Sequence, residues 1–262
     1  MPKKLIGLLA CFLILASTTV YAQDEPTEHE TPPQIAVSDA YIRVVDVNEQ
    51  GWIGWIALVN LSAQAVRVLA VDEVEVAPID LPPNAPTSAL IALPNVIDVT
   101  TGDAIPVTLT LADAHDRTFD LRVAVPVVDD APETARLAIV DAWARPMSLS
   151  GVSGAYMQLV NLGETDIVIV SAETRTAGMV DLHQTLMEGS MMRMNMIPTV
   201  IIPAGQTATF EPGASHIMLD DLALELIDGG ALALTLIFDD RTTQIIGVPI
   251  YDRALEAIEH TH

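Results

Sequence analysis

Two histidines and two methionines in the second half of the chain have types and spacing that suit binding of a soft metal ion. His183 and Met194 are separated by ten residues, and Met194 is followed after twenty-one residues by His216 and Met218, which flank one residue. Imidazoles and thioethers favour Cu(I), whereas Zn²⁺ prefers thiolate, imidazole or carboxylate ligands, and Ca²⁺ and Mg²⁺ require oxygen. The pattern His-x10-Met-x21-His-x-Met therefore predicts a Cu(I) site.

Strand alternation and a hairpin would bring these four side chains together. His216 and Met218 are two residues apart, so on a strand both side chains leave the same face. His183 and Met194 flank residues 188–189, and a two-residue turn there places His183 directly across from Met194. A four-residue loop would make this pair diagonal neighbours, and a three-residue loop would separate them.

The same segment is rich in further methionines. Nine of the ten methionines lie from Met147 to Met218, and the tenth is the initiator. We expect Met196 on the same face as Met194, but beyond the pair that Met194 forms with His183. Two interpretations stay open for the methionines around the hairpin, namely packing in a β core or a secondary thioether surface that captures copper. These residues are Met187, Met191, Met192 and Met196.

The motif and its surroundings resemble the periplasmic copper chaperones called PCu(A)C, and the resemblance covers most of residues 138–250. Besides the motif, the matching features are Asp-Leu at 181–182, a Met-x-Gly hairpin at 187–189, Ile-Pro-Ala-Gly at 202–205 and Glu-Pro-Gly at 211–213. The resemblance implies that His183, Met194, His216 and Met218 bind one Cu(I) per chain. It also implies delivery by ligand exchange to an acceptor, either the copper centre in subunit II of cytochrome c oxidase or another periplasmic copper carrier.

Other classes of function are less well supported by the residues. No serine lies in a nucleophile-elbow pattern and no histidine lies in a recognisable acid–base pair, so the sequence indicates a protein that is not an enzyme. A copper-buffering or resistance protein and a metal-free adhesion or scaffold module remain alternatives. His260 and His262 have a spacing that fits either a Cu(II) site or a solvated tail, and His29 lies in an acidic segment.

The elements that must position the motif are β-strands. After residue 34, short runs rich in Val, Ile, Leu and Thr alternate with turns at Pro, Gly, Asn and Asp. No long window keeps an apolar period of 3.6 residues, and only residues 254–260 look weakly helical. The predicted fold is all-β, with two Greek-key β-sandwich domains in tandem, and the resemblance implies that they are cupredoxin-like.

An internal repeat divides the chain. Residues 36–43 resemble residues 138–145, and Leu-Val-Asn-Leu occurs at both 58–61 and 159–162. We therefore predict homologous domains at 35–128 and 137–251, joined by an acidic linker at 129–136.

The two copies differ in the middle. Only 29 residues separate Asp72 from Gly102, whereas 55 separate Glu173 from Gly229, so the second copy carries 26 additional residues. All four motif residues lie between Glu173 and Gly229, and the first copy has no methionine. We therefore expect the copper site to lie wholly within the second domain, and the first to be a degenerate repeat without metal ligands.

The N-terminus has the pattern of an export signal. A basic pair at residues 3–4, an apolar run at 5–16 and small residues before Gln23 predict a signal peptide at 1–22, followed by an acidic leader at 23–34. Export to the periplasm with cleavage of this signal would remove Cys11, the only cysteine. Two alternatives would keep it: a lipoprotein that is cut before Cys11, or a membrane anchor formed by the apolar run. That run is shorter than the ~20 residues of a membrane span, so we expect no span after signal removal.

Charge excludes one class of partner. The chain has 12 Lys and Arg against 35 Asp and Glu, a formal net charge of −23. Such a surface repels phosphate backbones, so nucleic-acid binding is not expected. The acidity suits solubility or docking to a basic partner.

Overall fold

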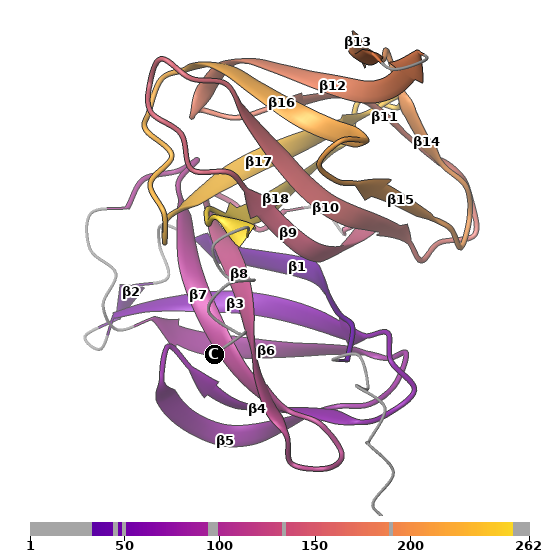
Figure 1. Ribbon diagram of the computed structural model, residues 1–262. Coiled ribbons are helices and arrows are strands. Elements are labelled where there is room, and N and C mark those ends of the chain that lie inside the picture. Colours follow the sequence, from indigo (N-terminus) through magenta and orange to yellow (C-terminus); the bar gives the residue numbers. More distant parts are fainter. Residues whose placement is uncertain are drawn as a thin grey trace, which may run out of the picture. The chain divides into compact units, whose positions relative to one another are not determined.

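The computed structural model describes residues 33–43, 47–48, 51–93, 99–132, 135–188 and 191–253, and its elements are β-strands (Figure 1). The predicted signal peptide with Cys11, most of the leader with His29, and the tail with His260 and His262 lie outside these residues. No helix in the described residues is long and apolar enough to cross a membrane. The predicted all-β fold is thus confirmed.

The first half of the chain forms strands that enclose one hydrophobic core. The strands β1, β3 and β6 face the strands β8, β7, β4 and β5, and Ile42, Leu81 and Leu111 are buried between them. The strands of this half are β1 (Ile35–Arg43), β2 (Val47–Asn48), β3 (Gly51–Asn60), β4 (Val66–Val71), β5 (Val74–Leu81), β6 (Pro86–Leu93), β7 (Ala104–Ala112) and β8 (Thr118–Val128).

The second half encloses a second core between two layers. One layer has the order β13-β12-β16-β10-β9, with β15 also on β10, and the other has the order β14-β11-β17-β18. Leu159, Ile217 and Phe238 are buried between the layers. The strands are β9 (Leu137–Ala144), β10 (Ser153–Asn161), β11 (Ile167–Glu173), β12 (Ala177–Glu188), β13 (Met191–Met196), β14 (Val200–Ile202), β15 (Thr207–Phe210), β16 (Ser215–Leu222), β17 (Ala231–Phe238) and β18 (Thr243–Pro249).

The repeat in the sequence corresponds to a repeated polar clamp. Asn161 is buried, and its amide nitrogen donates hydrogen bonds to the carbonyls of Thr165 (2.8 Å) and Ile202 (2.9 Å). Asn60 is equally buried and donates to the carbonyls of Gln64 (2.7 Å) and Leu81 (2.9 Å). Each Asn therefore ties the turn that follows its own strand to a strand of the opposite layer.

Replacing Asn161 by alanine is expected to lower the free energy of unfolding by about 2–3 kcal/mol, because the buried carbonyl of Ile202 and the partly buried carbonyl of Thr165 lose their donor. Chemical denaturation followed by circular dichroism measures the change. Asn195→Ala, at an exposed position of β13, is the control and should change stability by less than about 0.5 kcal/mol. Equal stabilities of the two variants would contradict the clamp.

The additional segment of the second half forms a hairpin. The strands β12 and β13, with the two residues between them, span Ala177 to Met196, which is 20 of the 26 additional residues. β12 pairs with β16, and β13 pairs with β12 at the end of the strand order. The added hairpin thus extends one layer of the second sandwich.

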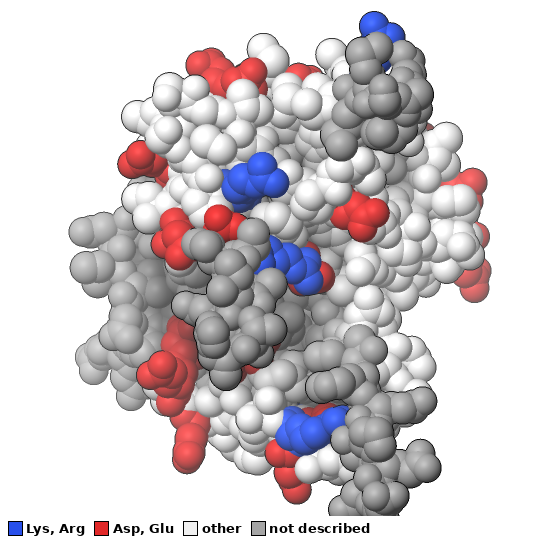
Figure 2. All heavy atoms as spheres, viewed as in Figure 1, with Lys and Arg blue, Asp and Glu red and all other residues white. Residues whose placement is uncertain are grey.

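The acidic residues are distributed over the surface. Figure 2 shows Asp and Glu side chains scattered over the visible face of both halves, with fewer Arg side chains between them. Some arginines of the described residues pair with carboxylates, as Arg136 does with Asp240 at 2.7 Å and Arg253 with Asp141 at 2.6 Å.

Candidate metal centre

The two motif histidines form a cross-strand pair. His183 on β12 lies directly opposite His216 on β16, and their ring centroids are 5.6 Å apart. Met218 follows His216 by two residues on the same strand, so it lies on the same face and opposite Asp181. Three of the four residues predicted from the sequence are therefore brought together on one face of the sheet.

Burial of the alternate residues sets this orientation. Leu182, Ile217 and Leu219 are buried in the core between the two layers. Since successive side chains on a strand point to opposite faces, His183, His216 and Met218 lie on the outer face. Packing of the apolar neighbours thus fixes the side on which the histidines stand.

The register predicted for the β12–β13 hairpin with a turn at 188–189 is wrong, because the connection lies one residue further along the chain. The strand β12 ends at Glu188 and β13 begins at Met191, so residues 189–190 connect them rather than 188–189. As a result His183 lies opposite Met196, and Met194 lies opposite Thr185. Met194 is on the predicted face, but it is a diagonal neighbour of His183 and not its direct partner.

The site is closed at the histidines and open at the hairpin. The His216 side chain is 8% exposed, His183 and Met218 are partly buried, and Met194 and Met196 are 63% and 66% exposed. The side chains of Met187, Met191 and Met192 lie outside the described part of the structure. The two imidazoles therefore sit at the base of the site, with solvent-exposed thioethers at its rim.

Hydrogen bonding assigns the atom with which His216 can act as a ligand. Its Nδ1 lies 3.2 Å from the carbonyl oxygen of Ala214, which places a proton on Nδ1 and a lone pair on Nε2. Nδ1 of His183 is buried and has no hydrogen-bond partner among the described residues. A buried polar atom without a partner costs about 1–3 kcal/mol, and a bound metal ion would satisfy it.

The donor set fits a soft cation. The described residues contain no group of three or more His, Cys, Asp or Glu side chains arranged to hold a metal ion. Two thioether side chains lie on the same face as the imidazoles, with Met196 opposite His183 and Met218 two residues after His216. Asp181 and Asp220 lie on the same face: Asp181 is opposite Met218 on the neighbouring strand, and Asp220 is two residues beyond Met218 on β16. Their carboxylates add a negative field that favours approach of a cation.

Comparisons with known proteins match the second half of the chain, which contains the candidate site. The family model "LpqE-like: Putative lipoprotein LpqE-like" matches residues 137–250. A "putative lipoprotein" of Leifsonia xyli subsp. xyli is 33% identical over 112 residues, which is 42% of this chain and 67% of the relative. The chain belongs to the LpqE-like family. This family is related to the PCuAC proteins, so the resemblance drawn from the motif is confirmed.

Three further matches of this LpqE-like chain have lower sequence identity. An uncharacterized protein of Rickettsia prowazekii is 29% identical over 127 residues, which is 47% of this chain and 70% of the relative. The copper-bound PCuAC domain from PmoF2 is 20% identical, with 47% of this chain and 96% of that one covered and a TM-score of 0.38. CuI-DR1885 from Deinococcus radiodurans is 28% identical, with 44% and 79% covered and a TM-score of 0.36.

Sequence reasoning missed a row of aromatic rings beside the histidines in this LpqE-like chain. The ring centroid of Tyr156 lies 6.3 Å from that of His216 and 4.5 Å from that of Trp143, and Trp143 lies 6.0 Å from Tyr251. Burial, with a smaller contribution from the Asp141 carboxylate, raises the pKa of the Tyr251 phenol. Trp143 and Tyr156 are both buried, and the Tyr156 ring lies beside His216 on the site's own face.

A glycine makes room for this row. Gly154 on β10 lies opposite Met218, and a Cβ at Gly154 would come within 2.6 Å of the Tyr156 hydroxyl. The absence of a side chain there lets the Tyr156 ring lie next to His216. The glycine was visible in the sequence, but its partner across the sheet was not.

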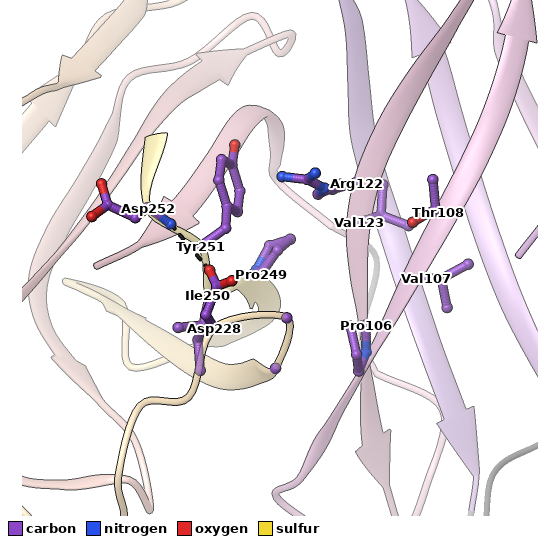
Figure 3. A pocket seen from close by; sticks show the side chains of 12 residues that line it. Pro106, Val107, Thr108, Arg122, Val123, Asp228, Pro249, Ile250, Tyr251 and Asp252 are labelled. Atoms are coloured by element: carbon purple, nitrogen blue, oxygen red, sulfur yellow. Dashed lines mark hydrogen bonds between the residues drawn. The ribbon is translucent and has the colours of Figure 1, made fainter. Parts of the chain in front are cut away.

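The cleft shown in Figure 3 is separate from the metal centre. It has a volume of about 320 Å³ and is lined by residues of β7 and β8 together with Asp228 and Tyr251, with the Arg122 guanidinium 4.9 Å from the Tyr251 ring centroid. None of the four motif residues lines it. The candidate site on the outer sheet face and this cleft are therefore two different features of the molecule.

Proposed function

We propose that this protein is a carrier that binds one Cu(I) per chain through His183, Met194, His216 and Met218. The observation that carries the proposal is the direct His183–His216 pair, with the buried and unpartnered Nδ1 of His183 among the described residues. Two imidazoles and thioethers are soft, neutral donors, which favours Cu(I) over harder cations.

The shape of the site suits transfer rather than permanent storage. His183 and His216 are held by the sheet, whereas Met194 stands 63% exposed on the last strand of the layer. A partner's ligand can therefore approach from the hairpin side and replace the thioether before the imidazoles release the ion. In this proposal copper is a cargo that the protein carries, and the protein is not an enzyme.

Location and acceptor complete the proposal. The N-terminal pattern and the family relationship support export to the periplasm, where thioethers cannot be oxidised to disulfides. The resemblance to PCu(A)C supports an acceptor with a copper centre, such as subunit II of cytochrome c oxidase. We further propose domains at 35–128 and 137–251, with copper bound only in the second, because the first lacks all four residues.

An anaerobic titration tests the function. The wild-type chain should take one Cu(I) in competition with a chelator, and X-ray absorption should show two nitrogen and two sulfur ligands. Mixed with an apo copper domain of oxidase subunit II, the loaded chain should lose its copper to that domain within minutes. Tight binding without transfer would indicate a buffering protein, and no binding would leave a metal-free β-sandwich module.

A further inference from the structure

We propose that Met196 is an exchangeable thioether ligand of the same site, and that it alternates with Met194 while Cu(I) is taken up and released. The inference rests on the proposed function, since it needs His183 and His216 to bind the ion. It adds a donor that the His-x10-Met-x21-His-x-Met spacing does not contain.

Register places Met196 nearer to His183 than Met194 is. His183 and Met196 are a direct cross-strand pair, whereas Met194 pairs with Thr185. Side chains of directly opposed residues begin about 4.5–5.5 Å apart, and those of diagonal neighbours about 7–8 Å apart. The backbone thus gives the thioether of Met196 the shorter reach to an ion held by His183.

The backbone at Met196 is also firmly placed. The next residue, Ile197, donates its amide hydrogen to the carbonyl of Leu182 at 2.8 Å, and its side chain packs against the core of the second half. Leu182 immediately precedes His183 and is itself buried. The position of Met196 relative to His183 is therefore set by the sheet, while its side chain, 66% exposed, keeps its conformational freedom.

Exchange between the two thioethers is chemically simple. As one Cu–S bond breaks, the other forms, so copper stays Cu(I), no electron moves and no proton is released. Both methionines are exposed on β13, the last strand of the layer, so neither exchange partner must leave the core. An ion shared in this way moves along the open rim of the site, where an acceptor can reach it.

A double-mutant cycle tests the proposal. The variants are Met194→Leu, Met196→Leu and the double variant, because leucine keeps the apolar bulk and removes only the sulfur. Each single change should weaken Cu(I) binding less than about tenfold, and the double change should weaken it at least about tenfold more than the product of the two. Met196→Leu should also slow transfer of copper to a competing chelator several-fold.

The matched control is Met179→Leu. Met179 is 52% exposed on the same face of β12, but it lies opposite Asp220 and four residues from His183. A Met196→Leu variant that matches this control in affinity and transfer rate would overturn the proposal, as would a double variant no weaker than Met194→Leu. Either result leaves the copper function standing if the wild type binds Cu(I), whereas a wild type without Cu(I) binding overturns both.

Discussion

Replacing His216 by alanine is expected to lower the Cu(I) affinity of the protein at least about 100-fold. Changes that only disturb the orientation of a metal ligand typically cost about 10–100-fold, and this change removes a ligand. His216 is also the better positioned of the two histidines, since the Ala214 carbonyl holds its Nδ1 and the Tyr156 ring lies beside it. An anaerobic competition titration with a Cu(I) chelator measures the loss.

Two further variants make this result specific. His183→Ala should cause a loss of similar size, because the two imidazoles are paired across β12 and β16. His115→Ala, at an exposed position of the first half, should leave the affinity unchanged within about twofold. Circular dichroism verifies that each variant is folded. Retention of wild-type affinity by either His183→Ala or His216→Ala would remove the cross-strand pair from the site.

The second large effect is a loss of copper on acidification. Both imidazoles must be neutral to donate a lone pair, whereas thioethers do not titrate, so protons compete with copper only at His183 and His216. With two competing protons per ion, the apparent affinity should fall with a limiting slope of about 100-fold per pH unit. A slope of about tenfold per unit would mean that one histidine dissociates while the methionines hold the ion.

The measurement is the same competition titration from about pH 8 to about pH 5, corrected for protonation of the chelator. The His183→Ala variant provides the control, because with one histidine left its limiting slope should be about tenfold per unit. An affinity that stays constant over this range would exclude both histidines.

Much of the protein follows from local features of the sequence. The alternation of apolar residues with turn residues predicts an all-β chain, because strand periodicity depends on neighbours two positions apart. The Asn of each Leu-Val-Asn-Leu step marks the repeat, and the structure gives both residues equivalent hydrogen bonds. The types of the candidate donors can likewise be read from the sequence, since donor chemistry belongs to the side chain and not to the fold.

Only the tertiary structure decided which side chains meet. The His183–His216 pair joins strands 33 residues apart, and the ring row from His216 to Trp143 crosses three strands of one layer. Local spacing contains no information on such neighbours, because strand order and register arise when the whole sheet packs. For the same reason Tyr156 and Gly154 were not recognisable as supports of the site.

The register of the β12–β13 hairpin is the clearest example of a feature that the sequence alone does not determine. Turns at 188–189 and at 189–190 place Met194 and Met196, respectively, opposite His183, and both residues lie on the same face in either case. Side chains move to the other face of the sheet only when the pairing shifts by an odd number of residues. These two registers differ by two residues, so the hydrophobic pattern cannot distinguish them. A glycine at residue 189 suits either position of a two-residue turn. The choice depends on contacts beyond the hairpin, where the Ile197 amide bonds to the Leu182 carbonyl and its side chain packs on the core.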